Sequence, residues 1–504
     1  MLVRSLALLL TASLLSASFH GSLQANDNWS SFRNGGSNSS SDSQLPVSWS
    51  PESGIDWQVE TTGYGQSSPL YWEGTIYLTA VRGGMKEECL VLAYEAKTGN
   101  LKWECSIKAT EQANNYYAKS RGAPTPVVDG DAVYALFESG DVVAVSHEGK
   151  AKWQRSLFDE YGTFENGHGL GSSLAHSAKA VFVAIDHSGP SYLLAVDKAT
   201  GENIWKTERS SRASWTSPMV ATIHGKEQVI FSSNGTVDGY DAESGDQLWS
   251  VDGISGNTIP SVAVSGSFVF TGAKPSERSP SDGKQTCSCI EVKLTDEGFD
   301  AEIKWQADKA SCHYASPLVA NGCVYTMNDV GVLYCLDRES GEVQYRSRTQ
   351  GMCWATPVAV QKNVYLFGKN GTTTVVGSGS EFQEVAVNML WPEDVTPKPE
   401  TYTENAPKRS MRQTFVEQIF AADKNEDGKV TEEELPESMK RFFARFDLDS
   451  NGFIDEADIK AMESMRSSSG GSSSYGDPIL YGVAIGESSF FIRFGTRLYC
   501  VSGK

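Results

Sequence analysis

One phrase recurs between residues 67 and 349: an apolar strand, an acidic residue, a Ser/Thr-Gly turn and then an aromatic residue. It reads AYEAKTGNLKWE, AVSHEGKAKWQ, AVDKATGENIWK, GYDAESGDQLWS and CLDRESGEVQYR. Successive gaps between the aromatic positions are 50, 52, 44, 56 and 40 residues, the positions being Trp103, Trp153, Trp205, Trp249, Trp305 and Tyr345. A four-stranded β-propeller blade needs about that length. The repeat therefore predicts an all-β propeller.

Each phrase has the chemistry of a β-hairpin. Gly99, Gly201, Gly245 and Gly341 supply a permissive backbone, and the preceding aspartates, such as Asp197, can hydrogen-bond turn amides. The aromatic residue then opens the returning outer strand, where a large ring can wedge between neighbouring blades. These tryptophans are therefore predicted to hold the ring together and to have no part in catalysis.

A second phrase marks the first strand of each blade, usually Ser/Thr-Pro followed by an aliphatic residue, as in SSPLY, APTPVV, TSPMV, ASPLV and ATPVA. Proline is tolerated at the first residue of a strand. GDPIL is a late copy, and SSLAH and IPSVA are looser ones, so there are eight starts and eight predicted blades. We place them at residues 67–107, 122–157, 169–210, 214–253, 257–308, 315–349 and 353–390, with the eighth beginning at 477.

The last copy ends at CVSGK, before its outer strand, whereas the N-terminal segment IDWQVE is an outer strand without a blade. If the two segments share one sheet, the eighth blade is complete and the ring has no open edge. Blade seven departs from the pattern, because Val385 or Val387 stands where an aromatic residue is expected.

The D-x-x-(T/S)-G-x-x-x-W phrase resembles the tryptophan-docking repeat of the pyrroloquinoline-quinone-like (PQQ-like) propellers. That superfamily includes quinoprotein dehydrogenases and the propeller of the outer-membrane protein assembly machine. The resemblance covers most of the chain outside residues 391–476. It implies the fold and leaves the function open.

From Trp391 the pattern breaks. We predict a signal peptide at 1–25, the propeller at 26–390, a proline-rich linker at 391–409, an EF-hand pair at 410–466, a Ser/Gly-rich linker at 467–476 and the last blade at 477–504. The fold class is thus an eight-bladed propeller with a small α-helical EF-hand insertion between its last two blades.

The stretch DKNEDGKVTEEE matches each position of an EF-hand calcium loop. Ca²⁺ prefers several hard oxygen ligands, which alternate positions of such a loop supply. The predicted ligands of loop 1 are Asp423, Asn425, Asp427, the Lys429 carbonyl and a bidentate Glu434, with Gly428 at the turn. An acidic, solvated turn is the alternative interpretation.

The second loop, DLDSNGFIDEAD, ends in aspartate where loop 1 has glutamate. Its predicted ligands are Asp447, Asp449, Asn451, the Phe453 carbonyl and Asp458, with Gly452 at the turn. One methylene fewer makes bidentate reach harder, so we expect weaker binding, and a vestigial loop stays open.

Val430 and Ile454 occupy equivalent apolar positions and are predicted to pair the two loops across a short β-bridge. Only residues 435–446 separate the loops, enough for one shared helix that Pro436 can begin. Sensor-type pairs have two helices there, so we expect calcium to hold the module together and not to open a groove.

The N-terminus carries Arg4, an apolar run from Leu6 to about Ala17, and a cleavage position at Ala25, which predicts export to the periplasm or outside the cell. No later segment is long and apolar enough to span a bilayer. A formal charge of -20 argues against nucleic acid as a partner. The nine cysteines lack ligand spacing, and we expect most to be buried strand residues with at most one or two disulfides.

We assign no catalytic residue. By the resemblance, a quinoprotein dehydrogenase needs an axial cofactor cavity, usually with a disulfide between adjacent cysteines, and this chain has no Cys-Cys pair. Loops that hold Tyr116, Tyr117, Lys119, Arg121, Phe164, Glu165, His168, Arg212, Trp215, His313, Tyr314 and Trp354 are predicted to converge at the propeller mouth. Local packing of these loop residues is an equally good interpretation.

The sequence therefore predicts a calcium-binding scaffold for a protein or polysaccharide in the cell envelope. A quinone-dependent oxidoreductase is the alternative.

Overall fold

A computed structural model describes residues 28–113, 120–254, 256–273, 285–308, 310–328, 330–392, 480 and 482–503, and within the insertion 419–425, 427–435, 440, 443, 447, 451–455 and 458. The predicted signal peptide, Tyr116, Tyr117, Lys119 and Asp449 lie outside these residues. So do both ends of the insertion.

Eight four-stranded antiparallel units form the propeller. In blades one to seven the four strands pair in chain order, whereas blade eight takes its outer strand from the N-terminal part of the chain. The first four blades are β3–β6 (Leu70–Trp72, Thr75–Arg82, Glu88–Glu95, Leu101–Lys108), β7–β10 (Val127–Val128, Val133–Leu136, Asp141–Val145, Ala151–Ser156), β11–β14 (Ala175–His176, Ala180–Ile185, Ser191–Asp197, Asn203–Arg209) and β15–β18 (Met219–Ile223, Lys226–Ser233, Gly235–Asp241, Gln247–Ile254).

The next three blades are β19–β22 (Ala263–Ser265, Phe268–Thr271, Gln285–Thr295, Gly298–Asp308), β23–β26 (Leu318–Ala320, Cys323–Met327, Val332–Asp337, Val343–Arg348) and β27–β30 (Val358–Val360, Asn363–Phe367, Thr372–Gly377, Glu384–Met389). Blade eight comprises β33 (Val483–Gly486), β34 (Ser489–Phe494), β35 (Arg497–Ser502) and, from the other end of the chain, β2 (Ile55–Glu60). The predicted eight-bladed all-β fold is confirmed.

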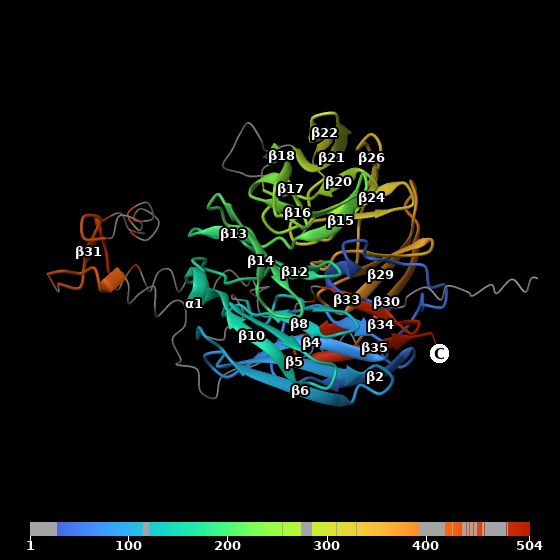
Figure 1. The fold of residues 1–504 in the computed structure, drawn as a ribbon, viewed down its shortest axis with the longest axis horizontal. Helices are drawn as coiled ribbons and strands as arrows, with labels where there is room; N and C mark the ends of the chain where they lie inside the picture. The colour runs from blue at the N-terminus through green and yellow to red at the C-terminus, as the bar shows by residue number, and fades with distance from the viewer. Residues whose placement is uncertain are drawn as a thin grey trace, which may run out of the picture.

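The ring closes where β2 pairs antiparallel with β35, Trp57 lying opposite Cys500. Figure 1 shows this junction, with the blue β2 beside the red β35. Because β2 and β35 form hydrogen bonds with each other, neither strand leaves an open sheet edge at the point where the two ends of the chain meet. The closure expected from the two incomplete sequence copies is present.

The outer-strand tryptophans join consecutive blades by one repeated contact. Trp57, Trp103, Trp153, Trp205 and Trp305 each donate the indole N–H to a backbone carbonyl of the next blade, at 2.7 to 3.1 Å. Each ring lies against the turn glycine of that blade, where a Cβ would come within 2.5 to 2.8 Å; these glycines are Gly99, Gly149, Gly201, Gly245 and Gly341. The turn glycine is therefore needed both for its positive φ and for its lack of a side chain.

Trp249 is the exception, because its indole N–H bonds to Gln228 Oε1 in its own blade at 2.7 Å. The corresponding turn of blade five, at Thr295–Gly298, lacks the Asp-x-x-Ser/Thr-Gly pattern. The ring still packs with blade-five residues such as Val262 and Ile290.

The Ser/Thr-Pro phrase builds a ring of hydrogen bonds on the inner side of the propeller. The backbone N–H of each Ser or Thr donates to the hydroxyl of its equivalent in the next blade, at 2.8 to 3.0 Å, in the order Ser68, Thr125, Ser173, Ser217, Ser261, Ser316 and Thr356. Six such bonds link seven blades, and the eighth position falls on residues outside the described ranges. Each hydroxyl therefore accepts a hydrogen bond from a buried backbone N–H of the preceding blade, so that this N–H is not left without a partner.

Helices are scarce among the described residues. The helix α1 (Leu157–Tyr161) follows blade two and is capped by Ser156, and the 3-10 turn η1 (Phe32–Asn34) precedes blade one. The predicted helices of the insertion fall largely on residues that the structure does not describe. Within the described part, β31 (Val430–Thr431) pairs with β32 (Phe453–Ile454), with Val430 opposite Ile454, as the sequence predicts.

Candidate functional site

The two loops of the insertion adopt the same backbone turn. In loop 1 the Asp423 carboxylate accepts hydrogen bonds from Asp427 N–H (3.3 Å) and Gly428 N–H (2.8 Å). In loop 2 the Asp447 carboxylate accepts them from Asn451 and Gly452, both at 3.0 Å. Each first-position carboxylate is therefore held at the centre of its loop, with Gly428 and Gly452 at positive φ at the turn.

The twelfth-position carboxylates also lie in matching places. Glu434 accepts from the N–H and hydroxyl of Thr431, both at 2.9 Å, and Asp458 accepts from the N–H of Asp455 at 3.1 Å. The Thr431 hydrogen bonds lower the pKa of Glu434, so this carboxylate is ionised at neutral pH. Loop 1 thus presents the carboxylate, amide and carbonyl oxygens that Ca²⁺ prefers.

Buried apolar residues hold the described ends of the two loops together: Ile419, Ala422, Val430, Leu435 and Ile454. Among the residues that the structure describes, no three His, Cys, Asp or Glu side chains gather into a metal-holding group by themselves.

The predicted mouth residues pair with their neighbours. His313 stacks on Tyr314 at a ring-centroid distance of 4.1 Å, Tyr314 stacks on Trp354 at 3.9 Å, and Lys369 Nζ lies 4.1 Å from the Trp354 ring centroid. His313, Tyr314 and Trp354 are half-buried. Loops of blades six and seven thus share one half-buried aromatic stack, with the buried Lys369 ammonium against its Trp354 ring.

A second group joins blades three and four at the same end of the strands. Trp215 donates to the Gly169 carbonyl at 3.0 Å and meets His168 edge to face at 5.8 Å. We call residues 164–169, 212–216, 313–315 and 352–356 the loop face. Arg121 is instead buried over the Tyr64 ring at 3.4 Å, and Arg212 donates to Thr236 Oγ1 at 2.7 Å.

Phe164 stacks at 4.9 Å on His187, a histidine that sequence reasoning did not select. His187 Nδ1 accepts from the Glu165 N–H at 2.8 Å, which leaves Nε2 as the donor to the Pro190 carbonyl at 2.7 Å. Both ring nitrogens are therefore occupied by backbone groups, and the residue has a structural role.

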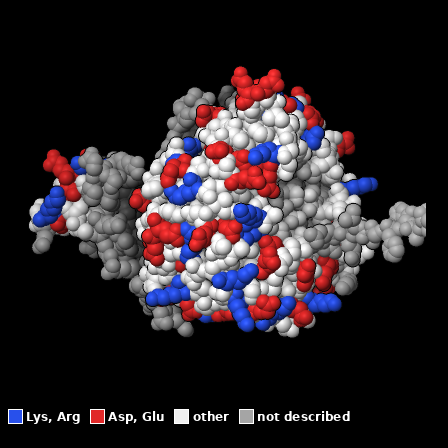
Figure 2. All heavy atoms as spheres, viewed as in Figure 1, with Lys and Arg blue, Asp and Glu red and all other residues white. Residues whose placement is uncertain are grey.

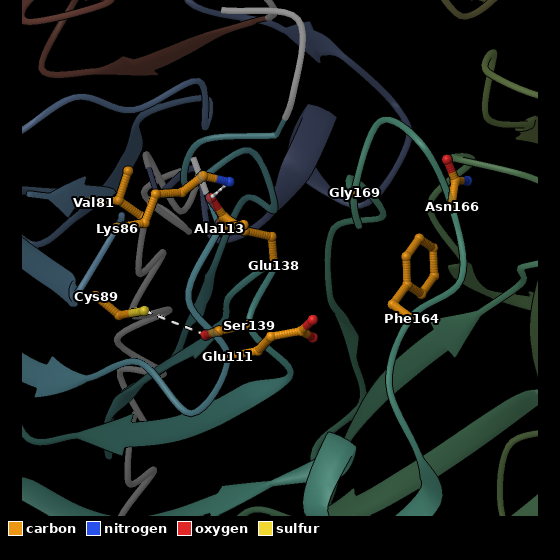
Figure 3. Close-up of a pocket in the computed structure, with 10 residues that line it drawn as sticks. All are labelled: Val81, Lys86, Cys89, Glu111, Ala113, Glu138, Ser139, Phe164, Asn166 and Gly169. Atoms are coloured by element: carbon orange, nitrogen blue, oxygen red, sulfur yellow. Dashed lines mark hydrogen bonds and ion pairs between the residues drawn. The ribbon is translucent and has the colours of Figure 1, made fainter. Parts of the chain in front are cut away.

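A small pocket lies between blades one and two (Figure 3), with a cavity volume of about 90 Å³. Lys86 is buried there and bonds to Glu138 at 3.1 Å and to the Ser120 carbonyl at 2.6 Å. Burial raises the pKa of the Cys89 thiol, so that sulfur stays protonated and is a poor nucleophile. Pockets for drug-sized ligands are several times larger, at roughly 300 Å³ or more.

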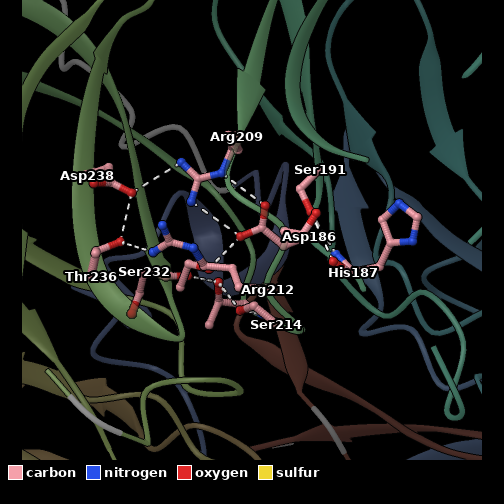
Figure 4. A network of polar contacts seen from close by, with 12 residues as sticks. Asp186, His187, Ser191, Arg209, Arg212, Ser214, Ser232, Thr236 and Asp238 are labelled. Carbon is pink, nitrogen blue, oxygen red and sulfur yellow. Dashed lines mark hydrogen bonds and ion pairs between the residues drawn. The ribbon is translucent and has the colours of Figure 1, made fainter. Parts of the chain in front are cut away.

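A buried polar network joins blades three and four (Figure 4). Arg209 bonds to Asp186 at 3.0 and 3.3 Å and to Asp238 at 3.2 Å, and the side chains are 3, 0 and 5% exposed. Ser250 and Thr236 satisfy Asp238 further, at 2.6 and 3.0 Å. The single guanidinium therefore compensates two buried carboxylates across the blade boundary.

The axis of the ring is occupied by the chain's own N-terminal segment, residues 29–40, which we call the plug. The first strands of neighbouring blades contact one another around the axis, and the plug contacts blades one, two, four, five, seven and eight there. Trp29 bridges to Tyr71, the Val128 N–H donates to the Ser30 carbonyl, and Gly36 lies against Met219.

The plug turns back at its tip and returns along blade seven. Four successive residues, Arg33 to Gly36, have positive φ. Asn38 then bonds to the Pro357 carbonyl at 2.6 Å, and β1 (Ser39–Ser40) pairs in parallel with β27. Sequence reasoning missed this segment; the cluster of Asn and Gly in FRNGGSN was the one available signal.

Comparison with known proteins agrees with this architecture. The family model described as outer membrane protein assembly factor BamB matches residues 37–166 and 160–287. The chain belongs to the PQQ-like β-propeller family. No curated protein matches this PQQ-like propeller.

Among solved structures, BamB from Moraxella catarrhalis superposes on the propeller with a TM-score of 0.52, at 10% identity, over 89% of this chain and 97% of that one. A computationally designed protein, Ika8, gives 0.48 at 14% identity over 66% and 89% of the two chains. A europium-containing methanol dehydrogenase gives 0.39 at 10% identity over 70% and 90%. At these identities the likeness concerns the fold alone.

Two surface properties complete the description. Acidic and basic side chains alternate over the face shown in Figure 2, which has no continuous basic area. Within the described ranges, no helix is long and apolar enough to cross a membrane.

Proposed function

We propose that this protein is an exported, calcium-binding scaffold that holds a protein or polysaccharide partner on the loop face of its propeller. The observation that carries the proposal is the occupied axis. Because the plug lies along the inner strands, we place the partner on the aromatic loop face and not in an axial cavity. The family match to an outer-membrane protein assembly factor supports a role in the cell envelope.

The quinone-dependent oxidoreductase is the alternative, and the described residues do not fit its cofactor well. The axial space that a quinone needs contains Arg33, Gly36 and Asn38, each in contact with inner strands. No two cysteines are adjacent in the sequence. We therefore expect pyrroloquinoline quinone and calcium to give no saturable spectral change and no alcohol or sugar oxidation; either result would favour the enzyme.

Partner binding is tested on the loop face. We expect the mature protein to capture a reproducible set of partners from envelope extract, identified by mass spectrometry. The Tyr314→Ala/Trp354→Ala variant should lose most of that set, because it removes the stacked aromatic surface. The matched control is Leu101→Ser, on an exposed outer strand far from these loops in sequence. Equal capture by all three proteins would contradict a loop-face site.

The calcium proposal concerns the insertion, with loop 1 as the tighter site. By calorimetry on the full mature chain, Glu434→Gln should lose the tighter binding event, because one carboxylate of the loop and its bidentate reach are removed. Glu433→Gln is the matched control, since the neighbouring acid occupies no ligand position. We also expect Asp458→Glu to tighten the weaker event. Unchanged binding in Glu434→Gln would refute the ligand assignment.

Calcium is proposed to stabilise the module or dock it against a partner. Repeating the capture experiment with a chelator separates these roles. If partners are kept in chelator while the module loses stability, the ion is structural; if partners are lost, the module belongs to the interface.

A further inference from the structure

The tip of the plug carries a buried cation that the protein does not neutralise. Arg33 is 4% exposed, and its Nη2 donates to the Val262 carbonyl of blade five at 2.7 Å. Its backbone has φ 55 and ψ 30, in the left-handed region that costs energy for a residue with a side chain. Two unfavourable features therefore coincide at one axial residue.

Apart from the Phe32 ring, whose centroid lies 5.3 Å from the guanidinium carbon, the rest of the guanidinium has no partner among the described residues. Arg33 Nε and Nη1 are buried without a hydrogen bond, and no described carboxylate forms a salt bridge with this side chain. The contrast is Arg209, another buried arginine, which two aspartates compensate. A buried charge without a counterion is strongly unfavourable, and removal of the charge generally relieves it.

The Cys312 thiol, which interacts electrostatically with Arg33, does not act as its counterion. Burial lowers the pKa of Arg33 to about 10, so the guanidinium remains charged at neutral pH. Burial raises the pKa of the neighbouring Cys312 thiol well above its ordinary value, so that sulfur is neutral. Within the part of the chain that the structure describes, the positive charge is therefore uncompensated at neutral pH.

A cavity lies beside the plug tip. It has a volume of about 120 Å³ and is lined by residues 30–36 of the plug and by residues 174–176 and 218–220 at the first strands of blades three and four. A space of that size holds several waters or a small ion. Ser31 lines it, and because its hydroxyl oxygen accepts from the Gly35 N–H at 2.8 Å, its proton can still be donated.

We propose that the plug tip forms an axial anion site, in which a small anion, a carboxylate or an inorganic anion, neutralises the Arg33 guanidinium and accepts from its unpartnered N–H groups. Water can accept such hydrogen bonds but cannot cancel the charge. This site is independent of the loop-face scaffold and of the calcium loops. It makes the stability of the closed ring depend on anion concentration.

The test is thermal unfolding of the mature protein at constant ionic strength, with bulky gluconate exchanged for phosphate, acetate or chloride. We expect a saturable rise in Tm of about 3 °C with at least one small anion, since binding to the native state alone stabilises it. Arg33→Met should show no saturable rise. It should also unfold at a higher temperature than the wild type in gluconate.

The matched control is Arg493→Met. Arg493 is equally buried, but its donors reach the Thr79 and Gly495 carbonyls at 2.7 and 3.0 Å, so this variant should lose stability and keep the anion response. Identical anion responses in wild type and Arg33→Met would overturn the proposal. A crystal of the wild-type protein soaked in bromide gives a reading that no variant affects: an anomalous peak beside the Arg33 guanidinium supports the site, and its absence contradicts it.

Discussion

Arg209→Met is expected to lower the free energy of unfolding by about 3–5 kcal/mol. The substitution keeps most of the side-chain volume but leaves Asp186 and Asp238 buried, without the cation that bonds to both. The loss should appear as a lower midpoint in urea with an unchanged slope, because the surface exposed on unfolding stays the same.

The matched control is Lys206→Met on the same strand, β14. Lys206 pairs with Glu208, whose side chain is 71% exposed, and such pairs contribute about 1 kcal/mol or less. The double variant Arg209→Met/Asp186→Asn should be less destabilised than the sum of its single variants, since one uncompensated charge is removed. Equal losses of stability in Arg209→Met and Lys206→Met would show that the buried network contributes no more to the free energy of unfolding than an exposed ion pair does.

Removal of the closing strand is expected to have the largest effect of all. A chain that begins at residue 61 lacks β2 and leaves β35 with an open edge at the junction of the first and last blades. It also lacks Trp57, whose ring lies on Gly99 and whose N–H donates to the Ala96 carbonyl. We expect no cooperative unfolding transition by circular dichroism and aggregation on size exclusion.

A chain that begins at residue 43 distinguishes the effect of ring closure on stability from the effect of the plug, because it lacks the plug, including β1, but keeps β2. It should unfold cooperatively, at a lower temperature than the mature protein. Addition of the separate peptide 28–60 should restore part of the transition of the shorter chain. A chain from residue 61 that unfolds as the mature protein does would show that closure contributes nothing.

The local chemistry of the repeat made the ring predictable. Turn glycines, Ser/Thr-Pro starts and aromatic outer strands each act within a few residues, so eight blades and their closing strand could be placed before any contact was known. The Val430–Ile454 bridge was predictable for the same reason, since both residues hold the same position in their loops. The calcium ligands themselves stay a prediction.

Blade seven is the blade whose outer strand lacks the aromatic residue of the repeat. Val385 and Val387 are each 43% exposed on β30, whereas the aromatic residues that they replace are partly or wholly buried. In blade eight, β35 and β2 come from opposite ends of the chain and are not joined by a hairpin turn. An aromatic residue of blade seven therefore has no turn glycine in blade eight to pack against. Blade seven thus has valine in place of an aromatic residue at the junction where the next blade has no turn between its two outer strands.

The sequence alone determined the blades, their number and the manner of closure, because these follow from short-range turn chemistry and strand alternation. Only the tertiary structure decided what lies on the axis and between the blades. Arg33 meets Val262 across 229 residues, and Arg209 joins residues of two blades. Such contacts depend on where the closed ring brings distant backbones together, and no periodicity in the chain encodes them.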